Sequence, residues 1–571
     1  MASFSNLAAR LGSPRLQPRG ACALGAPWLL ILVVLVLLLP SSGTMPLLDR
    51  DEPRFAEATR EMMEGEHANW AVPYFNGQYR FDKPVLIYWM MWPFYLVFGA
   101  NEFSARLPSV LCTAAMAWLL WHMGRRWFSA ACGIFAGFGF VTCVQLLQHG
   151  RGALADMPMI LGVTVAHYAV FELLHAERPA HPRRWFLLLY GALGFGFLAK
   201  GPVTLAVPLL TVLIYRFVFW RQPLHWRNLR LGLGLPLVLL IIAAWGIPAV
   251  IRTHGLFFKI GIGEHVVERG FRTFQGHGGF VFYYLLTALL SLFPWIAFAG
   301  GGAVTVRRNW DSRNAFLVSW LAGTYLLFSF YTTKLPHYVM PAFPAFFLII
   351  GQLAQPQVTM PRWTSVWFWG TLLLGALIAG VALTEAFRIP AGESYSPLRD
   401  VLAGTGCIAL ALIVLAVLWR FGIVSASVVP LVVVAGSMFW LSSGLRAVTP
   451  ALRLQRLFNQ MPVGTAYGGY RFMEPSLVFY TDHLWEPVGS VEKLKEFMAK
   501  PGPRLAVCTE REIQPKNYLR WRWRGGQGKP EGVSRDAELA QIPTEGYRET
   551  VVDGFDVANS TWVTLRVYHR P

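Results

Sequence analysis

PWLLILVVLVLLLP, residues 27–40, contains no charged residue, and DEPRFAE, residues 51–57, follows it closely. The first stretch predicts the core of a membrane-spanning helix. The second places Asp51 and Glu52 at the membrane surface, where acidic groups are costly if hydrocarbon is near. Pro53 suits the first turn of a helix that begins beside Asp51. Two interpretations stay open: a solvated, well-capped helix outside the bilayer, or carboxylates that are kept there for chemistry.

The composition indicates a polytopic membrane protein. Of the 571 residues, 54% are hydrophobic and 14% are charged, and the mean hydropathy is +0.42. A soluble domain carries about 25% charged residues. The net charge of +18 lies mostly in short arginine-rich loops. In a membrane protein such loops indicate mainly how the chain is oriented in the membrane, and secondly that it contacts anionic lipids. A nucleic-acid partner is disfavoured, because no basic stripe alternates with exposed aromatics. The six cysteines form no CxxC pair and are interpreted as core residues.

Thirteen membrane spans fit the hydropathy pattern, and the loops between them alternate in arginine content. The positive-inside rule then makes the arginine-rich side cytoplasmic. The N-terminal apolar run is interpreted as a retained first span, because no typical cleavage site follows it. The predicted spans are residues 22–40, 106–123, 127–147, 157–174, 185–199, 202–219, 231–251, 281–300, 315–332, 338–354, 364–385, 401–419 and 422–443.

The apolar stretch Pro84–Ala100 is deliberately left out of these spans. It is short and interrupted by Pro93, and if it spanned the bilayer, every later arginine-rich loop would change sides. We therefore expect a helix that lies in or dips into the outer interface.

Three regions follow from this topology. Residues 1–21 are expected to be a cytoplasmic tail, residues 22–445 the membrane domain and residues 446–571 a soluble external domain. In the last region, residues 464–470 and 504–508 read as strands, residues 490–500 as a helix and residues 550–568 as a terminal strand pair, which predicts a small α/β fold.

Polar residues at span boundaries gather on the external side. Cations can hold a lipid phosphate and stabilise its negative charge as it leaves, and a carboxylate can orient or deprotonate an acceptor hydroxyl. The alternative is a purely structural role, in which each cation reaches a lipid head group and each acid pairs with a nearby arginine. The candidates are Asp51, Glu52, Arg54, Lys83, Arg151, Asp156, Lys200, His265, Arg269, Arg272, Lys334 and His337.

Eight short motifs in fixed order resemble the integral-membrane glycosyltransferases that include protein O-mannosyltransferases and the aminoarabinose transferases of lipid A. The closer similarity is to the aminoarabinose branch, over about residues 45–348, with a weaker echo at residues 474–480. The motifs are DEPRFAE (51–57), WAVP (70–73), FDKP (81–84), LAKGP (198–202), EHVVER (264–269), GHG (276–278), FPW (293–295) and TKLPHY (333–338).

The resemblance implies a glycosyltransferase-C fold in a bacterial inner membrane, with the active site and the C-terminal domain facing the periplasm. It implies a polyprenyl-phosphate sugar donor, inversion at the sugar carbon, and lipid A or another envelope glycan or protein as acceptor. By motif, Asp51 and Asp156 would be catalytic. The cations Lys83, Lys200, Arg269 and Lys334 would bind the donor phosphate. Acceptor or pocket roles would fall to Glu52, Arg54, Arg151, His265, Arg272 and His337.

Two rival functions stay open, together with the question of a metal. One is a protein O-mannosyltransferase with a Ser/Thr acceptor, and the other is a transporter for a lipid-linked sugar. No cofactor is certain. A divalent metal stays possible, because His265, His277 and His337 could bind one together with Asp51 or Glu52. The spacing of these histidines matches no metal-binding motif, however, and Asp82 stands where the resembling proteins often have the longer Glu, which argues against a metal.

Overall fold

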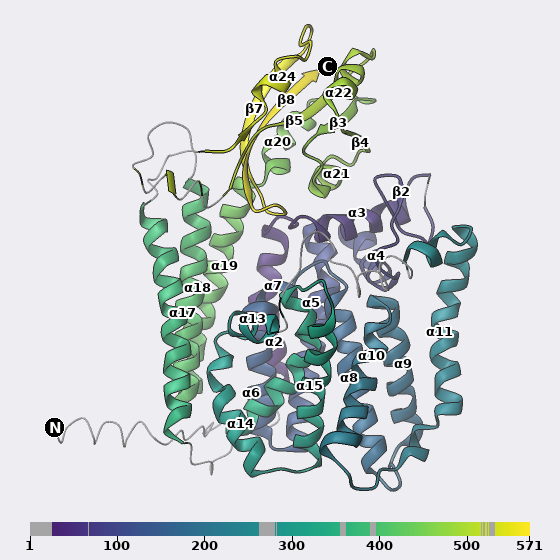
Figure 1. Cartoon of the computed structure of the whole chain (residues 1–571), viewed down its shortest axis with the longest axis vertical. Helices are drawn as coiled ribbons and strands as arrows, with labels where there is room; N and C mark the ends of the chain where they lie inside the picture. The colour runs from purple at the N-terminus through teal and green to yellow at the C-terminus, as the bar shows by residue number, and fades with distance from the viewer. Residues whose placement is uncertain are drawn as a thin grey trace, which may run out of the picture.

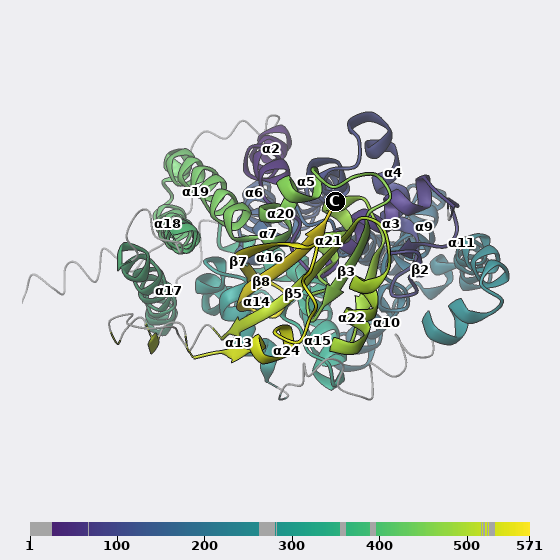
Figure 2. The same cartoon turned by 90° about the horizontal axis from the view of Figure 1, so that it is seen from above.

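The computed structural model describes residues 26–66, 68–261, 280, 282–354, 361–388, 396–514, 517, 520–521, 524 and 531–571. A body of long helices, running roughly side by side, lies beneath a smaller domain built around a sheet (Figure 1). Seen from above, the smaller domain covers the centre of the body, and α17, α18 and α19 stand to one side (Figure 2). The predicted helical membrane domain followed by a small α/β domain is confirmed.

The longer helices of the body are α2 (Ala26–Thr44), α5 (Glu102–Trp127), α8 (Asp156–His175), α9 (Pro182–Lys200), α11 (Leu231–Arg252), α15 (Ser312–Phe330), α17 (Arg362–Arg388), α18 (Ser396–Arg420) and α19 (Val428–Val448). The shorter segments are α3 (Asp51–Met63), α4 (Leu86–Phe98), α6 (Ala130–Val141), α7 (Val144–His149), α10 (Val203–Ile214), η1 (Tyr215–Phe219), η2 (Trp226–Leu229), α13 (Tyr283–Ser291), η4 (Trp295–Phe298), α14 (Ala299–Arg308), η5 (Pro336–Ala342), α16 (Phe343–Gly351), η6 (Gln352–Ala354) and η7 (Val424–Ser427).

The number of membrane-length helices is lower than the thirteen that hydropathy predicts. Within the described residues, eight helices are long and apolar enough to cross a membrane. A ninth span results if α13 and the η4–α14 segment are counted together, although they meet at 111°. The other four predicted spans fall on α6–α7, α9, α10–η1 and α15, which are helical but fail the same test of length and hydropathy.

The stretch Pro84–Ala100 forms only the thirteen-residue helix α4, which is shorter than the length expected of a span. One side of α4 is buried, through Ile87, Tyr88 and Met91 among others. Its partner α3 lies across the upper end of the helical body in Figure 1.

The C-terminal domain contains a mixed sheet in the order β4-β3-β5-β8-β7. β3 is parallel to β4 and β5, whereas β8 is antiparallel to β5 and β7. The predicted strands and helix are confirmed here. Its elements are α20 (Pro450–Phe458), β3 (Ala466–Tyr470), α21 (Pro475–Thr481), β4 (Trp485–Val488), α22 (Val491–Ala499), β5 (Arg504–Ile513), β6 (Val533–Ser534), α24 (Asp536–Leu539), β7 (Arg548–Asp556) and β8 (Thr561–Arg570).

The C-terminal domain is docked onto the loop between α2 and α5 by specific polar contacts. That loop contains α3 and a hairpin of β1 (Tyr74–Phe75) and β2 (Gln78–Tyr79). Asn76 in the hairpin turn donates to the Trp485 carbonyl at 2.8 Å and accepts from the Trp485 amide at 2.7 Å. The Leu47 amide donates to the Tyr480 hydroxyl at 3.0 Å. The segment 474–480, where the sequence shows the weaker family resemblance, is therefore hydrogen-bonded to the loop that contains Asp51.

Candidate active site

One cavity of about 1030 Å³ lies between the helical body, α3 and the C-terminal domain. One side is apolar and is formed largely by α11. Leu239, Ile247 and Ile251 line this side and are also 57–68% exposed, so this wall of the cavity reaches the apolar surface of α11. The polar residues that line the cavity are Asp49, Arg50, Asp51, Arg54, Arg80, Asp82, Lys83, Asp156, Lys200, Tyr331, Thr333, His337 and Tyr338.

Asp51 is the first residue of α3, and its exposed side chain lines the cavity. The helix buries Phe55, Ala58 and Met62, and Phe55, one turn after Asp51, also lines the cavity. Arg54, three positions on, lines the cavity beside Asp51. Burial, and secondly the nearby positive charge of Arg80, lower the pKa of Arg54.

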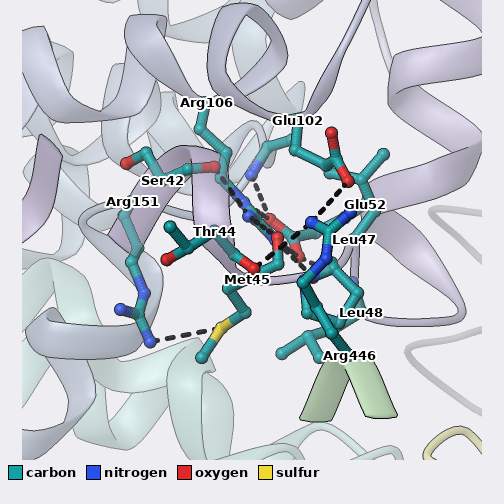
Figure 3. Close-up of polar contacts among 12 residues, drawn as sticks. Ser42, Thr44, Met45, Leu47, Leu48, Glu52, Glu102, Arg106, Arg151 and Arg446 are labelled. Atoms are coloured by element: carbon teal, nitrogen blue, oxygen red, sulfur yellow. Dashed lines mark hydrogen bonds and ion pairs between the residues drawn. The ribbon is translucent and has the colours of Figure 1, made fainter. Parts of the chain in front are cut away.

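Glu52 does not line the cavity, contrary to the predicted pocket role. Its two carboxylate oxygens accept from Arg106 at 2.9 and 2.7 Å, from the Leu48 amide at 2.8 Å and from the Ala153 amide at 2.7 Å (Figure 3). Burial alone would raise the pKa of Glu52, but Arg106 and these bonds hold it below its usual value. The sequence does not reveal this pair, because Arg106 belongs to a different helix.

Arg106 is 1% exposed and also donates to the carbonyls of Ser42 (2.9 Å), Met45 (2.6 Å) and Pro46 (2.7 Å). The Glu52–Arg106 pair therefore ties together the end of α2, the start of α3 and α5 (Figure 3). We infer that this pair positions Asp51 without itself entering the cavity.

Arg151 and Lys334 also lie outside the cavity lining. Arg151 is 4% exposed and contacts the Met45 sulfur at 3.3 Å (Figure 3). Burial, assisted by the positive Arg106, lowers the pKa of Arg151 to about 9. The Lys334 ammonium donates to the Ser329 carbonyl at 2.7 Å and to the Tyr331 carbonyl. These carbonyls lie at the C-terminal end of α15, where backbone carbonyls have no amide of the same helix to accept from. Lys334 therefore supplies the hydrogen bonds that this helix end lacks.

Asp156 and Lys200 form an ion pair of 2.6 Å inside the cavity. Asp156 is the first residue of α8 and Lys200 the last of α9, so each charge complements the dipole of its own helix. The Lys200 ammonium lies 5.8 Å from the centre of the Tyr338 ring. The His337 ring, also in the lining, lies 5.0 Å from the His149 ring.

Lys83 reaches the cavity in a loop that is braced by Arg80. Arg80 pairs with Asp82 at 3.1 Å, donates to the Tyr88 hydroxyl at 3.1 Å and lies 4.9 Å from the centre of the Phe55 ring. Sequence reasoning missed Arg80, although it belongs to the same short loop as FDKP.

Three predicted residues, His265, Arg269 and Arg272, lie outside the described residues, as does His277. Where the structure describes the chain, no three histidine, cysteine or carboxylate side chains cluster closely enough to hold a metal ion.

Comparison with known proteins agrees with this fold. The family model described as dolichyl-phosphate-mannose-protein mannosyltransferase matches residues 82–247. The crystal structure of ArnT from Cupriavidus metallidurans bound to undecaprenyl phosphate superposes with a TM-score of 0.74 at 21% identity, covering 94% of this chain and 97% of that one. The predicted glycosyltransferase-C fold is thereby confirmed.

Two curated relatives are similar to this chain and belong by name to the aminoarabinose branch. Both are named undecaprenyl phosphate-alpha-4-amino-4-deoxy-L-arabinose arabinosyl transferase. The protein of Enterobacter sp. (strain 638) is 30% identical over 342 residues, which are 58% of this chain and 60% of that protein. The protein of Aeromonas salmonicida (strain A449) is 29% identical over 335 residues, 57% of this chain and 59% of its own. The chain thus matches about 60% of the length of these relatives, and the predicted resemblance is confirmed.

Two carboxyl groups at the domain junction predict a pH-dependent stability. Burial raises the pKa of Asp49 to about 7, although the Ser476 amide donates to it at 2.9 Å. Burial, with Asp49 and Asp556 nearby, raises the pKa of Glu474 to about 8. The folded protein therefore holds protons that the unfolded chain has released. Stability must fall as pH rises from about 4 to about 8.

We expect the melting temperature, followed by tryptophan fluorescence, to fall between pH 6 and pH 9. The stability lost in this pH range should be about 2–4 kcal/mol, because the fall that these two raised pKa values cause is sampled only above pH 6. The double variant Asp49→Asn/Glu474→Gln should remove most of this slope. An equal slope in the variant and the unchanged protein would contradict the assignment of these two groups.

Proposed function

We propose that this protein transfers a sugar from a polyprenyl-phosphate donor to an acceptor outside the inner membrane, with lipid A as the leading acceptor. The observation that carries the proposal is that Asp51, Lys83, Asp156 and Lys200 line one cavity together with exposed apolar side chains of α11. The names of the two relatives support aminoarabinose as the sugar.

The apolar side of the cavity suits a polyprenyl chain. A lipid-linked donor must keep its hydrocarbon in the bilayer while its phosphate reaches polar groups. The exposed side chains of Leu239, Ile247 and Ile251 provide such a path along α11. ArnT, whose fold the chain shares, has been crystallised with undecaprenyl phosphate, which supports the same donor here.

Asp51 is the proposed base. Its exposed carboxylate would orient the acceptor hydroxyl and take its proton as the oxygen attacks the anomeric carbon. The bond from that carbon to the donor phosphate breaks, the configuration inverts, and the phosphate leaves with its negative charge. Lys83 would stabilise that charge. Lys200, held at 2.6 Å by Asp156, would add a fixed positive charge close to the phosphate.

The orientation proposed here places the cavity and residues 446–571 in the periplasm. Arg126, at the far end of α5, pairs with Glu172 near the end of α8, whereas α8 begins in the cavity with Asp156. Arg313 donates to the Trp127 carbonyl at that same far end. The arginine-rich loops thus lie away from the cavity, which supports a cytoplasmic assignment for them.

A Ser/Thr acceptor is the second candidate, because the family model that matches residues 82–247 is described as a protein mannosyltransferase. Mass spectrometry of lipid A and of secreted proteins from a deletion strain separates the two. Loss of sugar from lipid A supports the leading proposal, and loss from proteins supports the second.

Lys83→Ala tests the donor site. We expect donor affinity to fall by about tenfold or more, because the variant loses a charge-assisted contact to phosphate. Binding of labelled undecaprenyl phosphate to the purified protein measures this. Lys259→Ala, an exposed lysine outside the cavity lining, is the matched control. Equal affinity in both variants would remove Lys83 from the phosphate site.

A further inference from the structure

The C-terminal domain contributes directly to the cavity. Val557 and Ala558, in the turn that joins β7 to β8, are part of its lining. Figure 1 shows this hairpin reaching down from the sheet to the level of α3. We propose that this turn is the acceptor-side wall of the active site, and that Val557 and Ala558 select the acceptor. The inference rests on the proposed transfer reaction and gives the C-terminal domain a role in it.

The turn is fixed on both sides. The amide and side-chain nitrogen of Asn559 donate to the two carboxylate oxygens of Asp556 at 3.1 and 2.8 Å, which closes the turn. The Arg50 guanidinium donates to the Asn559 side-chain oxygen. Because Arg50 directly precedes Asp51 in the chain, the Arg50–Asn559 bond holds the turn close to the proposed base.

A second contact ties the same domain to the same loop. The Ser476 amide at the start of α21 donates to Asp49 at 2.9 Å. Asp49, Arg50 and Asp51 are consecutive, and the first two are held by the C-terminal domain. Movement of that domain therefore changes the position of the third.

The turn belongs to the polar part of the cavity lining, together with Asp49 and Arg50. Exposed α11 side chains form the apolar part, which suits the donor chain. The Arg50–Asn559 bond holds the turn close to the start of α3, where Asp51 lies. With the donor chain along α11, an acceptor whose hydroxyl reaches Asp51 would contact the turn, and a larger side chain at Val557 or Ala558 would hinder it.

The test enlarges the turn without changing its hydrogen bonds. In Ala558→Trp, we expect the acceptor KM for lipid A to rise by about tenfold or more, because bulk at the entry misplaces the acceptor. Binding of labelled undecaprenyl phosphate should change by less than about twofold. The matched control is Val551→Trp, which adds the same side chain at a 52% exposed position of β7 outside the lining.

Ala558→Cys provides a variant with almost no change in size. Alkylation of the folded variant by a maleimide should block transfer, and lipid A should slow the alkylation; the unchanged protein treated in parallel corrects for its own cysteines. An unchanged acceptor KM in Ala558→Trp, or full transfer by the alkylated Ala558→Cys protein, overturns the inference. An equal loss of donor binding in Ala558→Trp also overturns it, since the wall would then belong to the donor. Absence of transfer by the unchanged protein would instead count against the proposed function.

Discussion

Asp51→Asn should lower sugar transfer by about 10³-fold or more while leaving donor binding and folding intact. The amide keeps the size of the carboxylate but cannot take a proton. Asp51 is exposed at the start of α3, so no buried packing is lost. Transfer from labelled donor to lipid A, measured next to undecaprenyl phosphate binding, separates the two effects.

Glu64→Gln is the control for Asp51→Asn. It makes the same chemical change at an exposed position just beyond the end of α3 and should leave transfer unchanged. Transfer by Asp51→Asn at a rate close to that of Glu64→Gln would exclude Asp51 as the base.

Arg106→Ala should destabilise the protein by about 3–5 kcal/mol, because it leaves the Glu52 carboxylate buried without its partner. The carbonyls of Ser42, Met45 and Pro46 would lose their donor as well. A large fall in melting temperature, or failure to accumulate folded protein, is the expected measurement.

Two further variants serve as controls for Arg106→Ala. Arg126→Ala removes a partly exposed ion pair with Glu172 and should cost less than about 1 kcal/mol. The double variant Glu52→Gln/Arg106→Met removes both buried charges and should recover part of the lost stability. A stable and fully active Arg106→Ala protein would contradict the positioning role inferred here.

Features that depend on neighbouring residues could be predicted from the sequence. Hydropathy predicted where most helices lie, and the brevity of Pro84–Ala100 predicted α4. Alternation predicted β3 and the β7–β8 pair. The motif order predicted a fold that the ArnT structure shares. The predicted span 281–300 missed the bend of 111° between α13 and the η4–α14 segment, although Pro294 lies in the break.

The site was only partly predictable, because pairing between distant residues decides which charges face the cavity. Asp51, Arg54, Lys83, Asp156, Lys200 and His337 share one cavity. Glu52 and Lys334 are equally polar in sequence, but Arg106 and the end of α15 engage them elsewhere. Nothing near Val557 and Ala558 in the sequence indicates that they line the same cavity, since the hairpin reaches it only through the docking of the whole domain.

The donor site is tested most directly by a structure of the protein with undecaprenyl phosphate bound. We expect the phosphate within about 4 Å of the Lys83 ammonium, with the polyprenyl chain along α11 and Asp51 facing the phosphate across the polar end of the cavity. A lipid bound away from Lys83, with its phosphate outside the cavity that Asp51 and Lys200 line, would contradict the proposed function.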